Sequence, residues 1–414
     1  MLAKNIIILG LVYAIRLILP LMVIPILTRR IMAEDFGVYM YAISFAAWLS
    51  IFVEYGFNIS ATREIASSNS QTEILPVIAG TQSAKFLLVF ATLPVLIATV
   101  FIVPVFEGNM YWAITAWLLG ILTALTPIYY FQGRETLKIV GVTEITFGAL
   151  TLVSVYFLIH GPEDFYRLAV IVLVARFGSA AVLSYRMYNE CKVKISDIFY
   201  LKGALAHLKN GFHIFIFQGA VSLYTSFNVV LLGFYCSPVQ VGAYASAERL
   251  MRAGIGFLGQ FSNAIFPRIN SLKLKFPGKV KKFRLQVLIS FFLIGLLGMM
   301  LTLGFGPIIV AYMFPSMATQ VTNVLKILSL VVPAIALSNV LGFQYLLVDR
   351  HEKVFNMVIA GAAVINIIMA YFFVKKYQEK GMAISWVIIE WVIVFAIALM
   401  IFILQRRKKT IITD

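Results

Sequence analysis

The chain has 414 residues, of which 61% are hydrophobic and only 13% are charged, and its mean hydropathy is +0.93. Water-soluble domains carry about 25% charged residues, so this composition excludes an ordinary cytosolic enzyme. The net charge of +16 does not indicate nucleic-acid binding, because the 34 Lys and Arg are spread through loops between apolar runs. We therefore predict a polytopic membrane protein.

Apolar runs, separated by charged or turn-rich breaks, predict twelve transmembrane helices. A helix needs about 20 apolar residues to cross a bilayer, and these runs are long enough. The runs of the first half are 5–28, 36–60, 76–105, 110–131, 139–160 and 165–187. The runs of the second half are 208–235, 238–267, 284–311, 318–348, 353–374 and 380–404. The first run ends at Thr28 without a small-residue cleavage site, so no cleavable signal peptide is expected.

The distribution of Lys and Arg predicts the orientation of these spans. If the N-terminus is cytoplasmic, most basic residues outside the spans fall on the cytoplasmic side, as the positive-inside rule requires. The groups at 268–284 and 406–409 are the densest of them. Both termini are then cytoplasmic. Cys191 and Cys236 fall on opposite sides of the membrane, so they are not expected to form a disulfide.

The longest connection, 188–207, is basic and central, and it divides the spans into two groups of six. The predicted fold is an all-α membrane protein with two pseudo-symmetric six-helix lobes. The predicted parts are an N-terminal lobe at 1–187, a cytoplasmic linker at 188–207, a C-terminal lobe at 208–404 and a basic tail at 405–414.

A weak internal echo supports the two lobes. Gly, Tyr and Ala recur at the same spacing in Asp35–Ala42 and Gln240–Ala247, and Pro127 in the fourth span corresponds to Pro333 in the tenth. Six spans separate each pair, so the two halves have parallel topology. Transporters built from such repeats usually bind cargo between their halves.

Four motifs resemble a known family. They are GFNISATREIA at Gly56–Ala66, YYFQGRE at Tyr129–Glu135, VGAYASAERL at Val241–Leu250 and FPRI at Phe266–Ile269. Together they are similar to the lipid-linked oligosaccharide flippases of the O-antigen (Wzx) type, in the polysaccharide transport branch of the MOP superfamily. The resemblance covers the whole chain and implies a MATE-like fold.

The resemblance implies a function and partners. The cargo would be an undecaprenyl-diphosphate-linked repeat unit of O-antigen or a related polysaccharide, moved from the cytoplasmic to the periplasmic leaflet of a bacterial inner membrane. Partners would be this lipid-linked oligosaccharide, membrane lipids, and the polysaccharide polymerase and chain-length machinery. No nucleic-acid partner and no cofactor are expected, and the sequence contains no ATP-binding motif.

Charged residues inside the predicted spans suit such a cargo. An unpaired charge is very costly to bury, so a diphosphate needs a polar, cationic route, and ionisable residues within spans mark function by default. The basic residues are Arg16, Lys85, Arg176, Arg249, Arg252 and Lys326, and the acidic ones are Glu54, Glu144, Glu248 and Glu390. The surplus is positive, which is the sign that an anionic diphosphate requires.

The predicted cargo-binding residues differ in depth. They are Arg16, Lys85, Arg249, Arg252 and Lys326, with Arg63 at the inner end of the second span. Arg16 and Arg249 lie about 16 to 18 Å along the helix from a span end, at about 1.5 Å per residue, and so near the midplane. Lys85 and Lys326 are closer to span ends, where a long side chain can extend to the head groups.

Two acids are candidates for coupling transport to an ion gradient. Glu54 lies near the inner end of the second span, and Glu248 lies four residues before Arg252, with which it can pair on the same helix face. A purely structural role for Arg252 is an open alternative. Arg176 and Glu390 are interpreted as bridges between helices. Tyr129 and Tyr130 are interpreted as residues of the core or of an interface belt, with stacking on sugars as the alternative.

Two other functional classes are alternatives to a flippase. A membrane glycosyltransferase or polymerase of lipid-linked sugars would need catalytic acids, for which Glu34 and Asp35 in the first outside loop are the candidates. These acids also stand where a helix begins, and the outside loops are too short for a sugar-acceptor site. A drug or cation antiporter of the same superfamily would favour acids over bases inside the lobes. The cationic surplus disfavours it.

Overall fold

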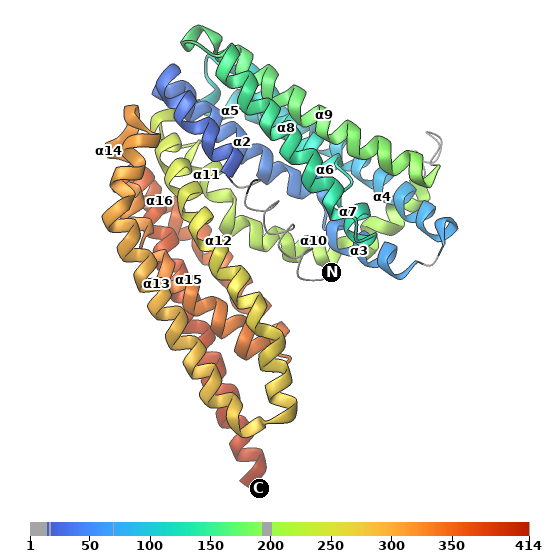
Figure 1. The fold of residues 1–414 in the computed structure, drawn as a ribbon, viewed down its shortest axis with the longest axis vertical. Helices are drawn as coiled ribbons and strands as arrows, with labels where there is room; N and C mark the ends of the chain where they lie inside the picture. The colour runs from blue at the N-terminus through green and yellow to red at the C-terminus, as the bar shows by residue number, and fades with distance from the viewer. Residues whose placement is uncertain (1–14, 16–17, 69, 193–200, 414) are drawn as a thin grey trace. The chain divides into compact units, whose positions relative to one another are not determined.

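The computed structural model describes residues 15, 18–68, 70–192 and 201–413, which fold into helices joined by short turns, with no β-strand among them (Figure 1). The chain forms two compact units. The first unit comprises 1–222 and 237–242, and the second comprises 223–236 and 243–414.

The first unit begins, in its described part, with a helix over 18–30. Its remaining elements are α2 (Ala33–Glu54), α3 (Phe57–Ser67), α4 (Gln71–Ala91), α5 (Leu93–Ile102), η1 (Pro104–Phe106), α6 (Met110–Leu125), α7 (Ile128–Gly133), α8 (Leu137–Leu158), η2 (Pro162–Asp164), α9 (Phe165–Cys191) and α10 (Leu201–Thr225). α9 and α10 extend into the predicted linker from both sides.

The predicted second span is broken between α2 and α3. Tyr55 (φ 51°) and Gly56 (φ 82°) both adopt the left-handed conformation that ends a helix. Gly56 also admits a close neighbour, because a Cβ atom there would stand 2.6 Å from Cγ2 of Ile214 on α10. Both the backbone conformation and the packing therefore explain why residue 56 is glycine.

The predicted fourth span is broken between α6 and α7 by Pro127. A proline restricts the residue before it to extended conformations, and Thr126 has φ −59° and ψ 124°. The helix therefore ends at Leu125 and restarts at Ile128.

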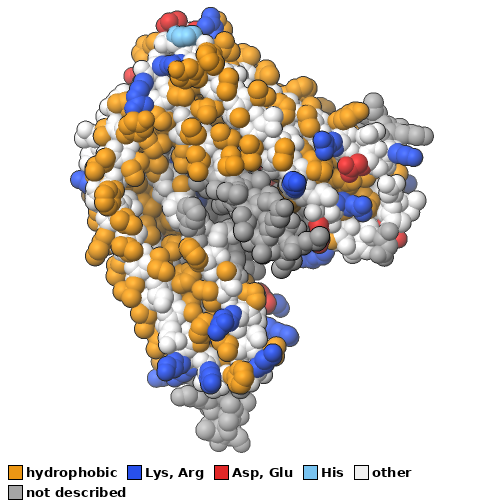
Figure 2. Space-filling view, in the orientation of Figure 1, with side chains coloured by type: hydrophobic (Ala, Val, Ile, Leu, Met, Phe, Trp, Pro, Cys, Tyr) orange, Lys and Arg blue, Asp and Glu red, His pale blue; other side chains and the backbone are white. Residues whose placement is uncertain are grey.

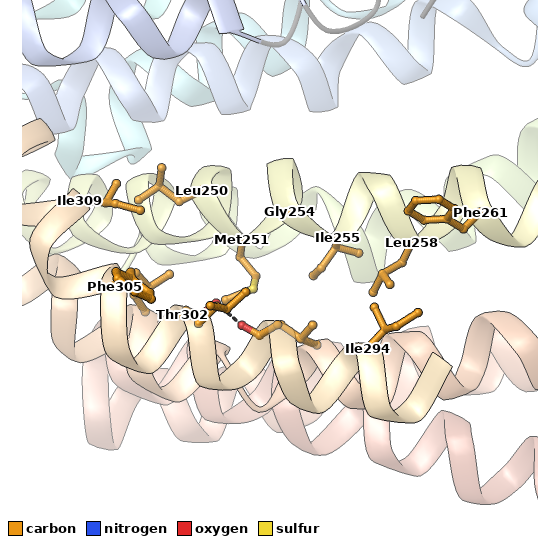
Figure 3. A pocket seen from close by; sticks show the side chains of 15 residues that line it. Leu250, Met251, Gly254, Ile255, Leu258, Phe261, Ile294, Thr302, Phe305 and Ile309 are labelled. Atoms are coloured by element: carbon orange, nitrogen blue, oxygen red, sulfur yellow. Dashed lines mark hydrogen bonds between the residues drawn. The ribbon is translucent and has the colours of Figure 1, made fainter. Parts of the chain in front are cut away.

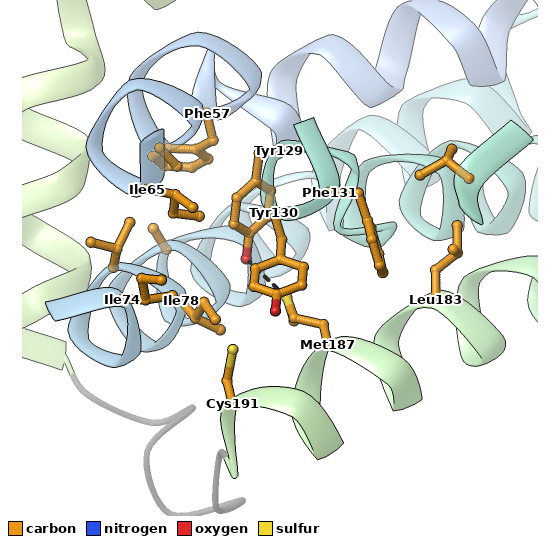
Figure 4. Packing of buried hydrophobic residues seen from close by; sticks show 14 of the residues in the cluster. Phe57, Ile65, Ile74, Ile78, Tyr129, Tyr130, Phe131, Leu183, Met187 and Cys191 are labelled. Carbon is orange, nitrogen blue, oxygen red and sulfur yellow. Dashed lines mark hydrogen bonds between the residues drawn. The ribbon is translucent and has the colours of Figure 1, made fainter. Parts of the chain in front are cut away.

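The core of the first unit forms around α7. Tyr129, Tyr130 and Phe131 are buried against α3 and α4 on one side and against Met187 and Cys191 of α9 on the other (Figure 4). The Thr62 hydroxyl of α3 donates a hydrogen bond of 3.2 Å to the Tyr129 carbonyl. The two first-half motifs of the sequence thus pack against each other, and the prediction that these tyrosines are core residues is confirmed.

The second unit begins with α11 (Phe227–Leu232) and contains two long helices. Its further elements are α12 (Pro238–Lys275, whose first turn belongs to the first unit), α13 (Pro277–Met313), η4 (Pro315–Met317), α14 (Ala318–Leu328), α15 (Val331–Asn339), the π-helical stretch η5 (Val340–Leu347) and α16 (Glu352–Thr413). α16 is two helices joined at Gln378, which has φ 53° and ψ −131°.

An ion-pair cluster braces the turn between α12 and α13. Asp349, which follows η5, accepts a two-pronged hydrogen bond from Arg284 of α13, with both N–O distances 3.0 Å, and another of 2.6 Å from Lys273 of α12. Figure 2 shows further Lys and Arg side chains gathered at this end of the second unit, where Lys281 and Lys282 are exposed.

The helices have the length and composition of membrane spans. Within the described residues, eight helical segments are long and apolar enough to cross a bilayer: Ala33–Glu54, Gln71–Ile102, Met110–Gly133, Leu137–Leu158, Pro162–Cys191, Gly278–Met313, Pro315–Leu347 and Glu352–Arg406. Large apolar side chains lie on their outer surfaces (Figure 2), such as Phe101 (77% exposed) and Met357 (72%). Lipid is the medium that such surfaces fit. The predicted all-α membrane class is therefore confirmed.

Candidate functional site: buried charges in each unit

Cations buried in the first unit donate hydrogen bonds to backbone carbonyls where the helix breaks at Pro127. In an unbroken helix, the N–H groups of residues 127 and 128 would donate to the carbonyls of Thr123 and Ala124. Proline has no N–H group, and the Ile128 N–H donates instead to Thr126 at 2.9 Å. Two backbone carbonyls are thereby released inside a membrane helix.

Lys85 and Arg176 supply the missing donors. Lys85 Nζ of α4 donates to the Ala124 carbonyl at 2.5 Å, and Arg176 Nη2 of α9 contacts the Thr123 carbonyl at 3.5 Å and the Thr126 hydroxyl at 3.3 Å. Backbone groups freed by proline in membrane helices must be satisfied by neighbours, because no water is available there. Both cations therefore have a structural task.

The predicted extension of Lys85 to the head groups is wrong. Its side chain is fully buried, and Nζ lies 4.9 Å from the centre of the Tyr129 ring. The free carbonyl of a helix 39 residues away draws the ammonium group inward. The position of Lys85 along its predicted span could not reveal this partner.

Two acids balance these cations. Glu144 of α8 lies 3.9 Å from Nη1 of Arg176, which confirms that Arg176 bridges helices. Glu54, at the end of α2, is partly buried, accepts a hydrogen bond from the Asn58 amide, and interacts electrostatically with Lys85 and Arg176. The first unit therefore contains a compact group of two bases and two acids.

A cavity of about 440 Å³ adjoins this group. Its polar lining comes from Arg176, Glu144, Thr123, Thr151 and Ser179, and the rest of its wall is apolar. The Ser179 hydroxyl is buried without a hydrogen-bond partner among the described residues. The cavity contributes polar space beside a group that has equal numbers of basic and acidic residues.

The second unit exposes more of its positive charge. Arg252 of α12 donates to Oε1 of Glu248 from Nε (3.0 Å) and Nη2 (2.6 Å), which confirms the predicted pairing one turn apart. The Glu248 side chain is 8% exposed, whereas that of Arg252 is 41% exposed. The guanidinium group also stacks 4.9 Å from the Trp386 ring. Arg252 is thus a cation that contacts both an acid and an aromatic ring and is still partly exposed.

The break in the second unit needs no cation. α14 ends at Leu328 and α15 begins at Val331, two residues before Pro333. The Ser329 hydroxyl donates to the Lys326 carbonyl at 2.7 Å, and the Val332 N–H donates to the Ser329 carbonyl at 3.2 Å. Here the Ser329 hydroxyl and a backbone hydrogen bond between residues three apart satisfy the carbonyls, as Lys85 and Arg176 do in the first unit.

A buried amide network in the second unit was not predicted. Asn366 donates to Asn228 at 3.1 Å and accepts from Ser385 at 3.2 Å, and Asn228 contacts the Tyr244 hydroxyl at 3.5 Å. The sequence signal for such a network was the presence of Asn228 and Asn366 within two apolar runs. Trp386 donates to Glu390 at 3.1 Å, a contact within one helix.

The remaining predicted site residues lie apart from these groups. Arg249 is half-buried beside Glu248 in the chain, while Arg63 on α3 and Lys326 in the last turn of α14 are exposed. Arg16 lies outside the described residues. Glu34 and Asp35 occupy the first turn of α2, and Met32 is the residue that precedes the helix.

The fold matches those of solved membrane transporters. "Lipid II flippase MurJ, inward closed conformation" superposes with a TM-score of 0.75 at 15% identity, covering 95% of this chain and 87% of that one. An inward-facing multidrug resistance MATE family transporter of the MOP superfamily superposes with a TM-score of 0.72 at 14% identity, covering 94% and 96%. At these identities the likeness defines the fold alone.

The sequence defines the family. Residues 2–273, more than half of the chain, match the polysaccharide biosynthesis protein family, and the chain belongs to it. A protein named "Putative O-antigen transporter" in Escherichia coli (strain K12) is 28% identical over 98% of this chain and 97% of its own length. A protein of the same name in Shigella dysenteriae is 28% identical over 94% and 98%.

Proposed function

We propose that this protein is a flippase that moves polysaccharide repeat units, linked to undecaprenyl diphosphate, from the cytoplasmic to the periplasmic leaflet of a bacterial inner membrane. The observation that carries the proposal is the exposed guanidinium group of Arg252, held between Glu248 and Trp386 on a long helix of a polysaccharide-biosynthesis family protein. The names of the relatives agree with transport of O-antigen.

The proposed topology is twelve transmembrane helices in two six-helix lobes, with both termini cytoplasmic. Broken helices account for the difference between this number and the number of separate helical elements. α2 with α3, α6 with α7, and α14 with α15 and η5 each correspond to one predicted span, whereas α16 contains two. The proposed parts are the lobes at 1–187 and 208–404, the linker at 188–207 and the basic tail at 405–414, as predicted from the sequence.

The proposed cargo contacts are ranked by the exposure of each charged side chain and by its place along the helices. Arg249 and Arg252 are the main phosphate contacts, because Arg252 is exposed and Arg249 is one helical turn from it. Lys326 and Arg63 are exposed and suit contacts at the ends of the path, and Arg16 completes the set. Lys85 acts on cargo only indirectly, through the shape of α6 and α7. A guanidinium group binds a phosphate through two parallel hydrogen bonds.

Coupling to an ion gradient is proposed for Glu54 and Glu248. Each acid neighbours a cation, so a change in the charge of the acid would change how that cation interacts with cargo. The two lobes would then exchange inward-open and outward-open states. The polysaccharide polymerase and chain-length machinery are proposed as partners that receive the cargo.

The direct test is translocation in proteoliposomes that contain the purified protein. A fluorescent lipid-linked oligosaccharide should move between leaflets and be recovered chemically unchanged, and protein-free liposomes should show no movement. Formation or cleavage of a glycosidic bond would establish an enzyme and overturn the proposal. Equal movement of a lipid without the diphosphate would also contradict it.

A further inference from the structure

Exposed lysines surround the turn between α12 and α13 of the second unit (Figure 2). They are Lys275 at the end of α12 and Lys279, Lys281 and Lys282 in the first two turns of α13. Among the residues that the structure describes, none of the four has an acidic partner, and the nearby Asp349 pairs with Lys273 and Arg284 instead. The turn therefore carries positive charge that no described carboxylate balances.

Exposed apolar side chains continue from Lys282 along one face of α13. They are Leu285 (52% exposed), Ile289 (50%) and Leu293 (58%), and we call these three residues the apolar stripe. Successive residues of a helix are about 100° apart, so all three lie within about 60° of Lys282 around the helix axis. Arg284 and Val287, which are buried, lie on the opposite face. The stripe therefore faces away from the rest of the second unit.

The apolar groove between α12 and α13 lies on a different face of α13 (Figure 3). Ile294, Phe305 and Ile309 line this groove, which has a volume of about 520 Å³. These three residues lie about 120° or more around the helix axis from Lys282, at about 100° per residue. In the described part of the chain, no charged side chain lines the groove. Positive charge therefore adjoins the stripe and not the groove.

The stripe has the length of one leaflet of a bilayer. From Lys282 to Leu293, α13 rises about 16 to 17 Å at about 1.5 Å per residue, and half of a hydrocarbon core of about 30 Å is about 15 Å. Lys279, Lys281 and Lys282 all lie within two turns before Leu285, the first residue of the stripe. An acyl chain along the stripe would therefore place its head group at the level of these lysines.

The lysines flank the stripe on both sides. At about 100° per residue, Lys279 lies about 60° to one side of Lys282 and Lys281 lies about 100° to the other. An ammonium group on a flexible stem acts as a point charge, which suits a phosphate that is not held in one orientation. Basic clusters immediately beside a membrane helix are typical of binding to anionic lipids. A zwitterionic head group would bring a cation of its own toward the lysines and fits less well.

We propose that α13 binds an anionic phospholipid, with an acyl chain along the apolar stripe and the phosphate among Lys279, Lys281 and Lys282. Lipid covers any exposed face of a membrane helix, and what the lysines add is selection of a negative head group. The proposal rests on the membrane class of the protein and not on its transport function. The lipid-linked cargo is also an anionic lipid, and the experiment separates it from phospholipid.

The experiment uses photocrosslinking of the full-length protein in nanodiscs of phosphatidylcholine. Two probes, phosphatidylglycerol and phosphatidylcholine, carry a diazirine group at the same position of an acyl chain, and labelled peptides are mapped by mass spectrometry. We expect about tenfold more crosslinking of 282–293 by the phosphatidylglycerol probe. Unlabelled phosphatidylglycerol should remove these crosslinks.

Three results would overturn the proposal. The first is equal crosslinking of 282–293 by the two probes, which would show that the head group is not selected. The second is stronger competition by polyprenyl diphosphate than by phosphatidylglycerol, which would assign the stripe to cargo. The third is crosslinking by the phosphatidylglycerol probe that is confined to other segments.

The matched variants each replace three exposed lysines by glutamine. In the test variant, the changes are Lys279→Gln, Lys281→Gln and Lys282→Gln, and phosphatidylglycerol crosslinking of 282–293 should fall to the phosphatidylcholine level. In the control, the changes lie near the turn of α16 at Gln378 and should have no effect on 282–293; they are Lys375→Gln, Lys376→Gln and Lys380→Gln. An undiminished preference in the test variant would contradict the proposal.

The wild-type protein provides a measurement that does not depend on the folding of a variant. Raising the salt concentration from about 0.1 M to about 1 M shortens the Debye length from about 10 Å to about 3 Å. The excess of phosphatidylglycerol over phosphatidylcholine crosslinking should therefore shrink severalfold, because the lysines are exposed. An excess that does not depend on salt would show that the charges of the lysines do not select the lipid.

Discussion

The two units solve the same local problem with different chemistry. Each contains a span interrupted by proline, α6 with α7 in the first unit and α14 with α15 in the second. Lys85 and Arg176 satisfy the carbonyls released in the first unit. In the second unit, the Ser329 hydroxyl and a backbone hydrogen bond between residues three apart satisfy them. Lys85 and Arg176 of the first unit thus satisfy backbone carbonyls, whereas the corresponding break in the second unit is satisfied by groups close to it in the chain.

This comparison shows that a charge inside a membrane span is not by itself a sign of cargo binding. Lys85 is fully buried and Arg252 is 41% exposed along its side chain, although the sequence ranks both as embedded cations. What separates them is whether a backbone group nearby lacks a donor. The predictions below test that distinction, from the largest expected effect to the smallest.

Loss of both α12 arginines should have the largest effect. Arg249→Gln with Arg252→Gln should abolish translocation of labelled lipid-linked oligosaccharide while the protein still inserts and folds, because both proposed phosphate contacts lose their charge. Lys at either position should keep part of the activity. Arg167→Gln, at an exposed arginine that pairs with the buried Asp164, is the control and should transport normally. Normal transport by the double variant would reject the proposed contacts.

Lys85→Met should destabilise the first unit without touching cargo directly. The variant leaves the buried Ala124 carbonyl without the Lys85 donor and removes one of the two cations that interact with Glu54, so we expect a loss of about 2 to 4 kcal/mol in unfolding free energy. Thermal unfolding in detergent measures it. Lys326→Met, at an exposed position, should change stability by less than about 0.5 kcal/mol. Equal losses of stability in the two variants would contradict the proposed difference between the units.

Glu54→Gln examines whether the first unit also has a functional acid. If Glu54 carries a proton during transport, this variant should slow translocation under an imposed pH gradient severalfold and leave cargo binding intact, and Glu54→Asp should keep activity. Proteoliposomes with and without the gradient provide the measurement. Wild-type transport that ignores the gradient would leave Glu54 with only its structural contacts to Asn58 and the neighbouring cations.

Asp349→Asn should weaken the brace between α12 and α13. Burial alone would raise the pKa of Asp349, but hydrogen bonds from Arg284 and Lys273 outweigh it and hold the pKa below its ordinary value of 3.8. The carboxylate therefore stabilises the fold above pH 3.8, and this contribution disappears as the pH falls through the lower pKa of the folded state. At pH 7 we expect the variant to lose about 1 kcal/mol.

Thermal unfolding of wild type and Asp349→Asn at pH 7 and pH 3 checks this prediction. The difference between the two proteins should shrink at the lower pH, since protonation removes in the wild type what the substitution removes in the variant. A difference that does not depend on pH would show that the brace does not act through charge.

Glu34→Gln with Asp35→Asn should have the smallest effect. Both residues stand in the first turn of α2, where a negative charge stabilises the helix by about 0.3 to 1 kcal/mol. We expect a loss of that size in stability and transport close to wild type. Complete loss of function, together with a glycosidic activity in the wild type that these substitutions abolish, would favour an enzyme instead.

The sequence by itself determined the all-α membrane class, because hydropathy is summed over neighbouring residues. The breaks at Gly56 and Pro127, within spans that were predicted to be continuous, appeared only in the structure. The sequence also determined the Glu248–Arg252 pair, since both residues lie on one helix face. Tertiary structure decided the partners of Lys85 and Arg176 and the link between Asn228 and Asn366, which are 138 residues apart. It also decided the groove between α12 and α13, because only the packed helices show that Gly254 faces open space.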